Sequence, residues 1–264
     1  MKKILFLILS SLFFSCSSDE TVEDNNYPLF EIPLVDGNYW TYDIETETNT
    51  SRDSLYVAND TLINSILHKK MKVKNNIATG FYSNSLKNNG LRVSGNKLLL
   101  SGDLSLSAGQ TLPFSLDLEL FEFIVFNADV NSGETLSTKS GTIQETVNGY
   151  PLTINYTLKS VSGNTFENYT APNNDTYSNV KSNKIILTAR IETSVSGFSV
   201  FLLNEQDVMV SEQFIAKNIG VVHTNTVTTY TLNPSIPAQL LNQIPFPNNQ
   251  TQTQSEFLDT YQVN

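Results

Sequence analysis

The stretch TIQETVNGYPLTINYTLK, from Thr142 to Lys159, decides the fold of this sequence. Apolar residues occupy alternate positions in its second half, at Leu152, Ile154, Tyr156 and Leu158. A two-residue period is typical of a β-strand that buries one face. The dipeptide Asn148-Gly149 separates the two halves and favours a type I′ turn, because both residues tolerate positive φ angles. The stretch therefore predicts a β-hairpin.

The same alternation recurs on both sides of this hairpin. The segments YWTYDIE and KIILTARIE each place a row of apolar side chains on one face: Trp40, Tyr42 and Ile44 in the first, and Ile185, Leu187, Ala189 and Ile191 in the second. Turn dipeptides separate other short apolar runs, at Asn59-Asp60, Asn64-Ser65 and Gly95-Asn96. Consecutive strands joined by such short turns are expected to pair antiparallel.

These signals predict an all-β protein, a single antiparallel meander that forms an open barrel or a two-layer sandwich with at most one short helix. The helix is expected within Pro237 to Ile244, because a proline opens this segment and Pro245 stops it. Residues 245–254, rich in Pro, Asn and Gln, read as a linker to a final strand over residues 254–264.

One stretch, FSLDLELFEFIVFNADV from Phe114 to Val130, changes its apolar face partway. Leu116, Leu118 and Leu120 share a face with Glu122, after which Phe123 and its alternate neighbours take over on the other face. This switch favours a β-bulge, with a short helix as the alternative. A packed core explains these residues best, and a wall for an apolar ligand is the functional alternative. The candidate wall comprises Leu116, Leu118, Leu120, Phe198, Val200 and Leu202.

The N-terminus has the layout of a secretory signal peptide over residues 1–15, with two lysines followed by a short apolar run. Ser15-Cys16 at its end resembles the lipobox of bacterial lipoproteins, in which the cysteine is acylated after cleavage. The alternative is a plain secretory signal with a stray cysteine. Residues 16–26 are polar and acidic, which predicts a flexible tether to a β-rich domain over residues 27–264. We therefore expect Cys16 to anchor the protein to a membrane through its lipid.

Two further segments resemble recurring parts of uncharacterised Bacteroidetes outer-membrane lipoproteins. PLVDGNYWTYD, from Pro33 to Asp43, looks like their opening strand, and EQFIAKNIGVV, from Glu212 to Val222, looks like a strand near their end. The serine and acid content of residues 17–20 also resembles the signal that places such lipoproteins on the cell surface. The resemblance implies a β-rich domain on the bacterial outer membrane and carries over no catalytic residue. Physically, Gly37-Asn38 suits a turn before the first strand, and Gly220 suits a close backbone approach or a bulge.

Composition and motifs exclude several kinds of chemistry. The formal net charge of −10 disfavours nucleic acid as a partner, because phosphates repel an acidic surface. The only histidines are His68 and His223, which we expect to be ordinary strand residues, so a zinc site or a Ser/His/Asp triad has too few members. The segment from Asn127 to Asn131 has the first spacings of a calcium loop, but Ser132 and Thr138 stand where glycine and glutamate are required. No metal and no cofactor is therefore expected.

The sequence leaves two functional hypotheses. The first is a non-catalytic cell-envelope lipoprotein whose β-domain binds a ligand or an envelope protein, with an apolar ligand held by the candidate wall as its most concrete form. The alternative is a hydrolase that acts on envelope glycan or lipid through paired carboxylates. Asp117, Glu119 and Glu122 are among the carboxylates available, although no spacing marks two of them as facing one another. Carboxylates gathered in one cleft would favour the enzyme.

Overall fold

The computed structural model describes residues 30, 32–106, 112, 114–147, 149–195, 197–242, 244 and 246–264. The signal peptide, Cys16 and the tether of residues 16–26 lie outside this part of the chain. The described residues form one antiparallel sheet of twelve strands, with two short α-helices and a 3₁₀ turn. The elements are β1 Tyr39–Thr46, β2 Thr50–Ile63, β3 Ile66–Val73, η1 Lys74–Asn76, α1 Phe81–Leu86, β4 Gly90–Ser94, β5 Lys97–Leu106, β6 Leu116–Asn127, β7 Thr135–Val147, β8 Tyr150–Thr170, β9 Thr176–Val195, β10 Phe198–Ala216, β11 Gly220–Thr231, α2 Ala238–Leu241 and β12 Asn249–Gln262.

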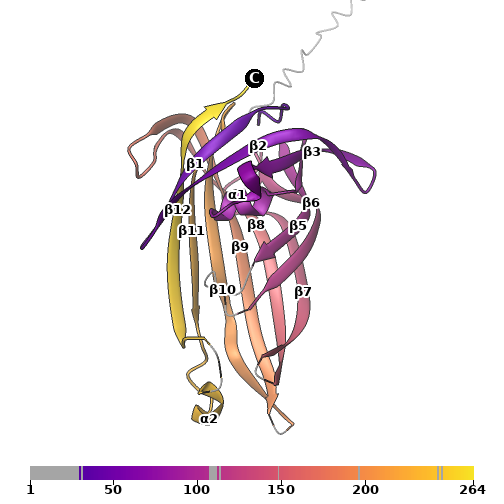
Figure 1. Ribbon diagram of the computed structural model, residues 1–264, viewed down its shortest axis with the longest axis vertical. Coiled ribbons are helices and arrows are strands. Elements are labelled where there is room, and N and C mark those ends of the chain that lie inside the picture. Colours follow the sequence, from indigo (N-terminus) through magenta and orange to yellow (C-terminus); the bar gives the residue numbers. More distant parts are fainter. Residues whose placement is uncertain are drawn as a thin grey trace, which may run out of the picture.

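The sheet curls until it nearly closes into a barrel (Figure 1). Its strand order is β6-β5-β4-β3-β2-β1-β12-β11-β10-β9-β8-β7, so the first and last strands pair and the two edges are β6 and β7. Side chains link β6 to the other end of the sheet. The Ile124 amide donates to Ser137 Oγ of β7 at 2.9 Å, and Ser160 Oγ of the adjacent β8 donates to the Ile124 carbonyl. The all-β meander is thereby confirmed, in its open-barrel form.

Alternation and turn chemistry place the strands as predicted. Trp40 is 4% exposed, and Tyr42 and Ile44 beside it on the same face are buried as well. The β2–β3 turn has positive φ at both Asn64 and Ser65, which is the type I′ geometry expected of a two-residue hairpin. Gly95 and Gly149 also adopt positive φ in their two-residue turns. Each of these turn dipeptides thus forms the hairpin that it predicts.

Two predicted connections are instead parts of strands. Asn59-Asp60 lies within β2, where both residues pair with β3, and a bulge directly precedes them between Val57 and Asn59, so this polar pair forms no turn. Residues 249–254 belong to β12 and not to a linker, because they pair residue by residue with β11. Their Thr and Gln side chains read as a loop in the sequence, yet alternate ones face the interior of the barrel.

The predicted face switch in β6 is a β-bulge. Glu122 has φ 52°, and the register against β5 shifts between Leu100 and Gly102, so two residues of β6 oppose one residue of β5. As a result Leu120 and Phe123 are both buried, whereas Phe121 is 45% exposed. The alternative of a short helix is wrong.

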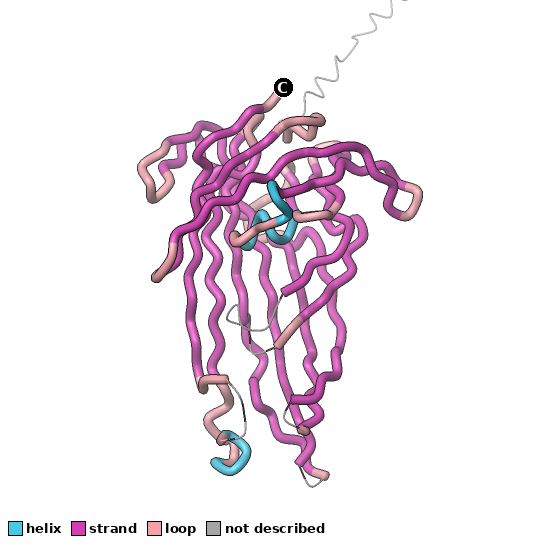
Figure 2. Tube along the Cα trace, viewed as in Figure 1, coloured by secondary structure: helices cyan, strands magenta, loops and turns pink. Residues whose placement is uncertain are grey.

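Both helices are short and occupy different places in the barrel. α2 lies within the predicted segment from Pro237 to Ile244, at the end of the long strands β8 to β12 (Figures 1 and 2). α1 was not predicted, and it packs inside the curled sheet, with Leu86 and Ser83 buried. Among the described residues, no helix is long and apolar enough to cross a membrane.

Candidate functional site

The inner face of β11 and β12 carries a ladder of uncharged polar side chains. Cross-strand partners in this ladder are Thr226 with Gln254 and Thr228 with Gln252. The alternating strand period points Thr229 and Thr251, which also pair with each other, to the outer face. We call the four inward residues, Thr226, Thr228, Gln252 and Gln254, the Thr/Gln ladder. A concave sheet face inside a barrel is normally apolar, so this polar stretch needs an explanation.

The Thr/Gln ladder forms one wall of a cleft of about 380 Å³. The rest of the lining comes mainly from the chain leading into α1, from α1 itself and from the ends of β1, β2 and β5. The cleft opens to solvent at a rim where Thr48, Asn49 and Ser105 are exposed. Its lining comprises the ladder and Ile44, Thr46, Thr48, Asn49, Ser51, Ala78, Thr79, Gly80, Phe81, Asn84, Ser105, Leu106, Leu112, Met209. None of these described lining residues carries a charge.

Side chains from distant strands cap the N-terminus of α1 at the back of this cleft. The consecutive amides of residues 80–82 donate to Asp53 Oδ2 at 2.8 Å, Gln254 Oε1 at 2.7 Å and Glu256 Oε1 at 2.8 Å. The amide of Thr79 also donates to the Asp53 carboxylate. A helix leaves its first amides without internal partners, so these acceptors hold α1 in place.

Glu256 is a buried carboxyl with only one of its oxygens engaged. Its side chain is fully buried, and Oε2 has no hydrogen-bond partner among the described residues. Burial raises the pKa of Glu256 to about 8, with a further contribution from the negative charge of Asp53. Glu256 is therefore largely protonated at neutral pH. A Cβ at Gly80 would overlap Oε2, so a larger residue at this position would displace the Glu256 carboxyl.

Asp53 and Glu256 are the buried carboxylates that the sequence reasoning missed. They lie on β2 and β12, and no local motif connects residues so far apart in the chain. Neither side chain lines the cleft, because the segment of residues 79–81 separates them from it. Their oxygens serve as acceptors for backbone amides, so the pair has a structural explanation.

The carboxylates singled out in the sequence do not converge. Asp117 and Glu119 are exposed on the outer face of β6. Glu122 forms an ion pair with Arg92, and its Oε1 lies 3.0 Å from His68 Nε2. The Arg92 guanidinium, and more weakly His68, lowers the pKa of Glu122. These groups form a cluster around the buried His68, and none of them lines the cleft.

His68 and His223 both lie in strands, β3 and β11, as expected. His223 stacks between Phe214 and Phe257, and its Nδ1 lies 2.6 Å from the hydroxyl of Tyr169. Burial lowers the pKa of His223 to about 4, so the imidazole is neutral at pH 7. Alternation places this stack on the face opposite the Thr/Gln ladder.

The calcium-like segment forms a turn whose oxygen atoms accept hydrogen bonds from other side chains of the protein. Both oxygens of Asp129 accept from the Asn96 side-chain amide, at 2.8 and 2.9 Å. The ammonium of Lys181 donates to the carbonyls of Ala128 and Val130 from a nearly buried position. No group of three or more His, Cys, Asp or Glu in the described part of the chain is placed to hold a metal ion.

The six residues of the candidate apolar wall do not share one surface. Leu116, Leu118, Leu120 and Leu202 are buried in the core, whereas Phe198 is 75% exposed at the start of β10. Phe198 and Leu202 differ in burial because the register of β10 against β9 shifts between residues 201 and 206. The wall is therefore not assembled as a unit.

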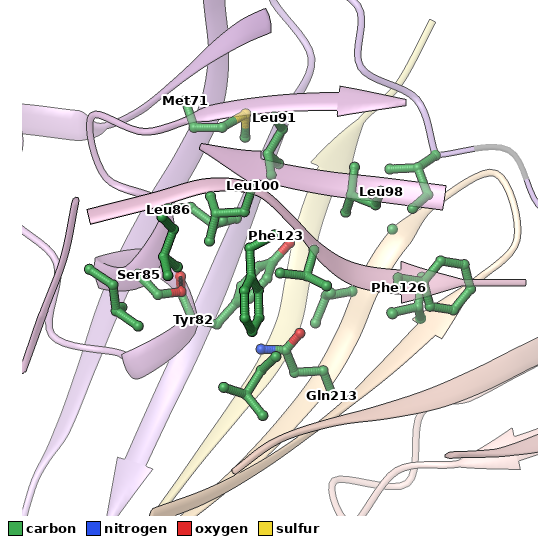
Figure 3. Close-up of a pocket in the computed structure, with 18 of the residues that line it drawn as sticks. Met71, Tyr82, Ser85, Leu86, Leu91, Leu98, Leu100, Phe123, Phe126 and Gln213 are labelled. Atoms are coloured by element: carbon green, nitrogen blue, oxygen red, sulfur yellow. Dashed lines mark hydrogen bonds between the residues drawn. The ribbon is translucent and has the colours of Figure 1, made fainter. Parts of the chain in front are cut away.

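A second, apolar cavity lies on the other side of α1 (Figure 3). Met71, Leu91, Leu100 and Phe123 line it from the sheet, together with Leu86 of α1. Its volume is about 50 Å³, which is room for a few water molecules at most and not for an acyl chain. Leu120 is the one residue of the candidate wall that reaches it.

In comparisons with known proteins, no family model, no curated protein and no solved structure matches this chain.

Proposed function

We propose that this protein is a non-catalytic lipoprotein of the bacterial outer membrane that binds a small ligand in the cleft beside the Thr/Gln ladder. Acylated Cys16 would hold it at the membrane, and the serine and acidic residues at 17–20 would direct it to the cell surface. An envelope protein remains the other class of partner that the sequence allows.

The two segments that resemble Bacteroidetes lipoproteins support this assignment by their position in the fold. Trp40, from the first segment, donates from Nε1 to the carbonyl of Ile219 in the second, at 2.6 Å. Tyr42 Oη donates to the carbonyl of Val221 at 2.9 Å. Segments that are 179 residues apart in sequence thus form one structural unit, which is a physical reason for them to occur together.

The observation that carries the binding proposal is the hydrogen bonding of the Thr228 and Gln252 side chains. Neither side chain hydrogen-bonds to another described residue, although both are half-buried and face the cleft. Neither is among the fully buried atoms that lack a partner, so these groups are open to the cleft, where a bound ligand can replace water as their hydrogen-bond partner. The cleft volume lies within the range of roughly 300–1,000 Å³ typical of small-molecule sites.

The hydrolase alternative has weaker support. A general acid must lie within hydrogen-bond reach of the group that it protonates. Glu256 has the raised pKa of such an acid, but it is fully buried behind Gly80 and outside the cleft lining. We therefore propose a binding role and not catalysis.

Native mass spectrometry of the mature domain tests the proposal. The domain, without its lipid, is incubated with a small-molecule extract of the bacterial envelope and separated from unbound material. We expect a retained small molecule with wild type, and its loss with Thr228→Trp, whose indole fills the cleft. Thr251→Trp is the matched control, because position 251 is exposed on the outer face of the adjacent strand. Retention that is equal in both variants, or absent in wild type, would contradict the proposal.

A further inference from the structure

We infer that the ligand of the cleft is an uncharged saccharide unit, an inference that rests on the binding role proposed above. Three features of the cleft carry it: the absence of charge, the kind of free hydrogen-bonding groups and the mixture of these groups with apolar surface.

The cleft is neutral in a strongly acidic protein. The sequence has 26 acidic and 16 basic residues, yet no described residue lining the cleft is charged. A charged ligand would lose its hydration here without gaining a counter-charge, which is costly. The buried carboxyls behind the cleft wall, Asp53 and Glu256, accept hydrogen bonds from the segment of residues 79–82 and do not line the cleft. The site therefore selects against both anions and cations.

The free polar groups are hydroxyls and primary amides. The hydroxyl of Thr228 and the amides of Gln252 and Asn84 have no side-chain hydrogen bond within the described protein. Each of these groups can both donate and accept. A ligand that matches them offers several groups that also do both, at short spacing, which is the pattern of hydroxyls around a sugar ring.

Apolar side chains interrupt the polar lining. Ile44, Phe81 and Met209 reach the cleft from β1, α1 and β10. The faces of a pyranose ring are formed by C–H groups, whereas its rim carries the hydroxyls. A cleft with hydroxyl and amide groups on one wall and apolar groups beside them fits this division.

Calorimetric titration of the mature domain tests the ligand class. The neutral probes are cellobiose, maltose and the disaccharide of N-acetylglucosamine, and the charged probes are glucuronate and glucosamine. We expect saturable binding of at least one neutral disaccharide and at least tenfold weaker binding of the charged sugars. Equal or tighter binding of a charged sugar would overturn the inference.

A pair of double variants locates the binding. Thr228→Val with Gln252→Met removes the free polar groups at nearly constant shape, and we expect about tenfold weaker binding of the disaccharide. The control, Thr229→Val with Thr251→Val, makes a comparable loss of polar groups on the outer face and should leave binding unchanged. Equal effects of the two variants would overturn the inference. Trp40 emission reports whether each variant is folded. If a variant does not fold, the comparison of neutral and charged sugars on wild type still tests the inference.

A third arm separates failure of the ligand class from failure of the binding role. The probe is 1-aminoanthracene, an uncharged apolar dye. If wild type binds the dye but no saccharide, and Thr228→Trp abolishes dye binding, the ligand class is wrong and the binding role survives. If wild type binds neither the dye nor a saccharide, and retains nothing from the envelope extract, both proposals fail.

Discussion

Trp40 on β1 lies directly against Gly220 on β11. A Cβ at position 220 would stand 3.2 Å from the indole Nε1 and 3.5 Å from Cε2, and Gly220 has φ 110°. The glycine therefore meets two demands together, the close approach of a ring and a backbone angle that other residues rarely adopt. Because β12 lies between β1 and β11 in the sheet, this contact joins the strands around the seam where the two ends of the domain meet.

The first prediction concerns this contact. Gly220→Ala should destabilise the protein more than Gly37→Ala does. Both positions have positive φ, and an alanine there costs about 1–2 kcal/mol. Gly37 has open space around its Cα, so the excess at position 220 measures the crowding of Trp40. Urea unfolding gives both free energies, and equal losses would show that the ring is not held against Gly220.

The second prediction concerns Trp40 itself, the single tryptophan of the chain. Trp40→Ala should lower the free energy of unfolding by about 3–5 kcal/mol, because it removes a large buried side chain. Trp40→Phe should cost less but should leave the Ile219 carbonyl without its donor, for about 1–3 kcal/mol. Native tryptophan emission should be blue-shifted and poorly quenched by iodide. Emission typical of a water-exposed indole would contradict the packing.

The third prediction follows from the buried carboxyl of Glu256. In the folded protein its pKa is about 8, against a usual value of 4.5. Between these values the folded chain holds a proton that the unfolded chain has released, so stability falls as pH rises from about 4.5 to about 8. The loss should reach a few kcal/mol, since each pKa unit corresponds to about 1.4 kcal/mol.

Glu256→Gln should remove this part of the pH dependence. Other carboxyls contribute their own slopes, so the informative quantity is the difference in unfolding free energy between wild type and variant at each pH. Glu45→Gln, at an exposed position on β1, is the control and should leave the profile parallel to wild type. If Glu256→Gln gives a parallel profile too, Glu256 is ionised in the folded protein.

The fourth prediction concerns the membrane anchor. Cys16→Ala should convert a membrane-bound protein into a soluble secreted one with an unchanged melting temperature, because the thiol is expected to carry lipid and not to serve the fold. Cell fractionation with a salt wash, followed by thermal unfolding of the released protein, measures both properties. A variant that stays with the membrane after the wash would rule out lipid as the anchor.

Local signals in the sequence predicted the hairpins well, and the long-range contacts poorly. Alternation at Trp40, Tyr42 and Ile44 was sufficient to assign a buried face, and the turn residues located most hairpins. The Thr/Gln ladder escaped prediction because a strand of alternating polar residues has no apolar face to mark which side turns inward. Those residues became interpretable only once β12 was seen to pair with β11 and β1.

The α1 helix escaped prediction for a related reason. It has six residues, too few for an apolar period, and no side chain of its own caps it. Its N-terminal amides find acceptors on Asp53, Gln254 and Glu256, which lie 27, 173 and 174 residues from their donors. Tertiary structure therefore stabilises a helix for which the local sequence has no signal, and the same contacts form the back of the cleft.

The most direct test of the central claim, that the cleft beside the Thr/Gln ladder is the binding site, is an NMR titration that observes the threonine methyl groups. The mature domain is labelled at these methyls and titrated with the tightest-binding disaccharide of the panel. The account predicts saturable shifts at Thr226 and Thr228, with Thr229 and Thr251 on the outer face unchanged. Shifts confined to the outer pair, or none at any of the four while the domain remains folded, would contradict it.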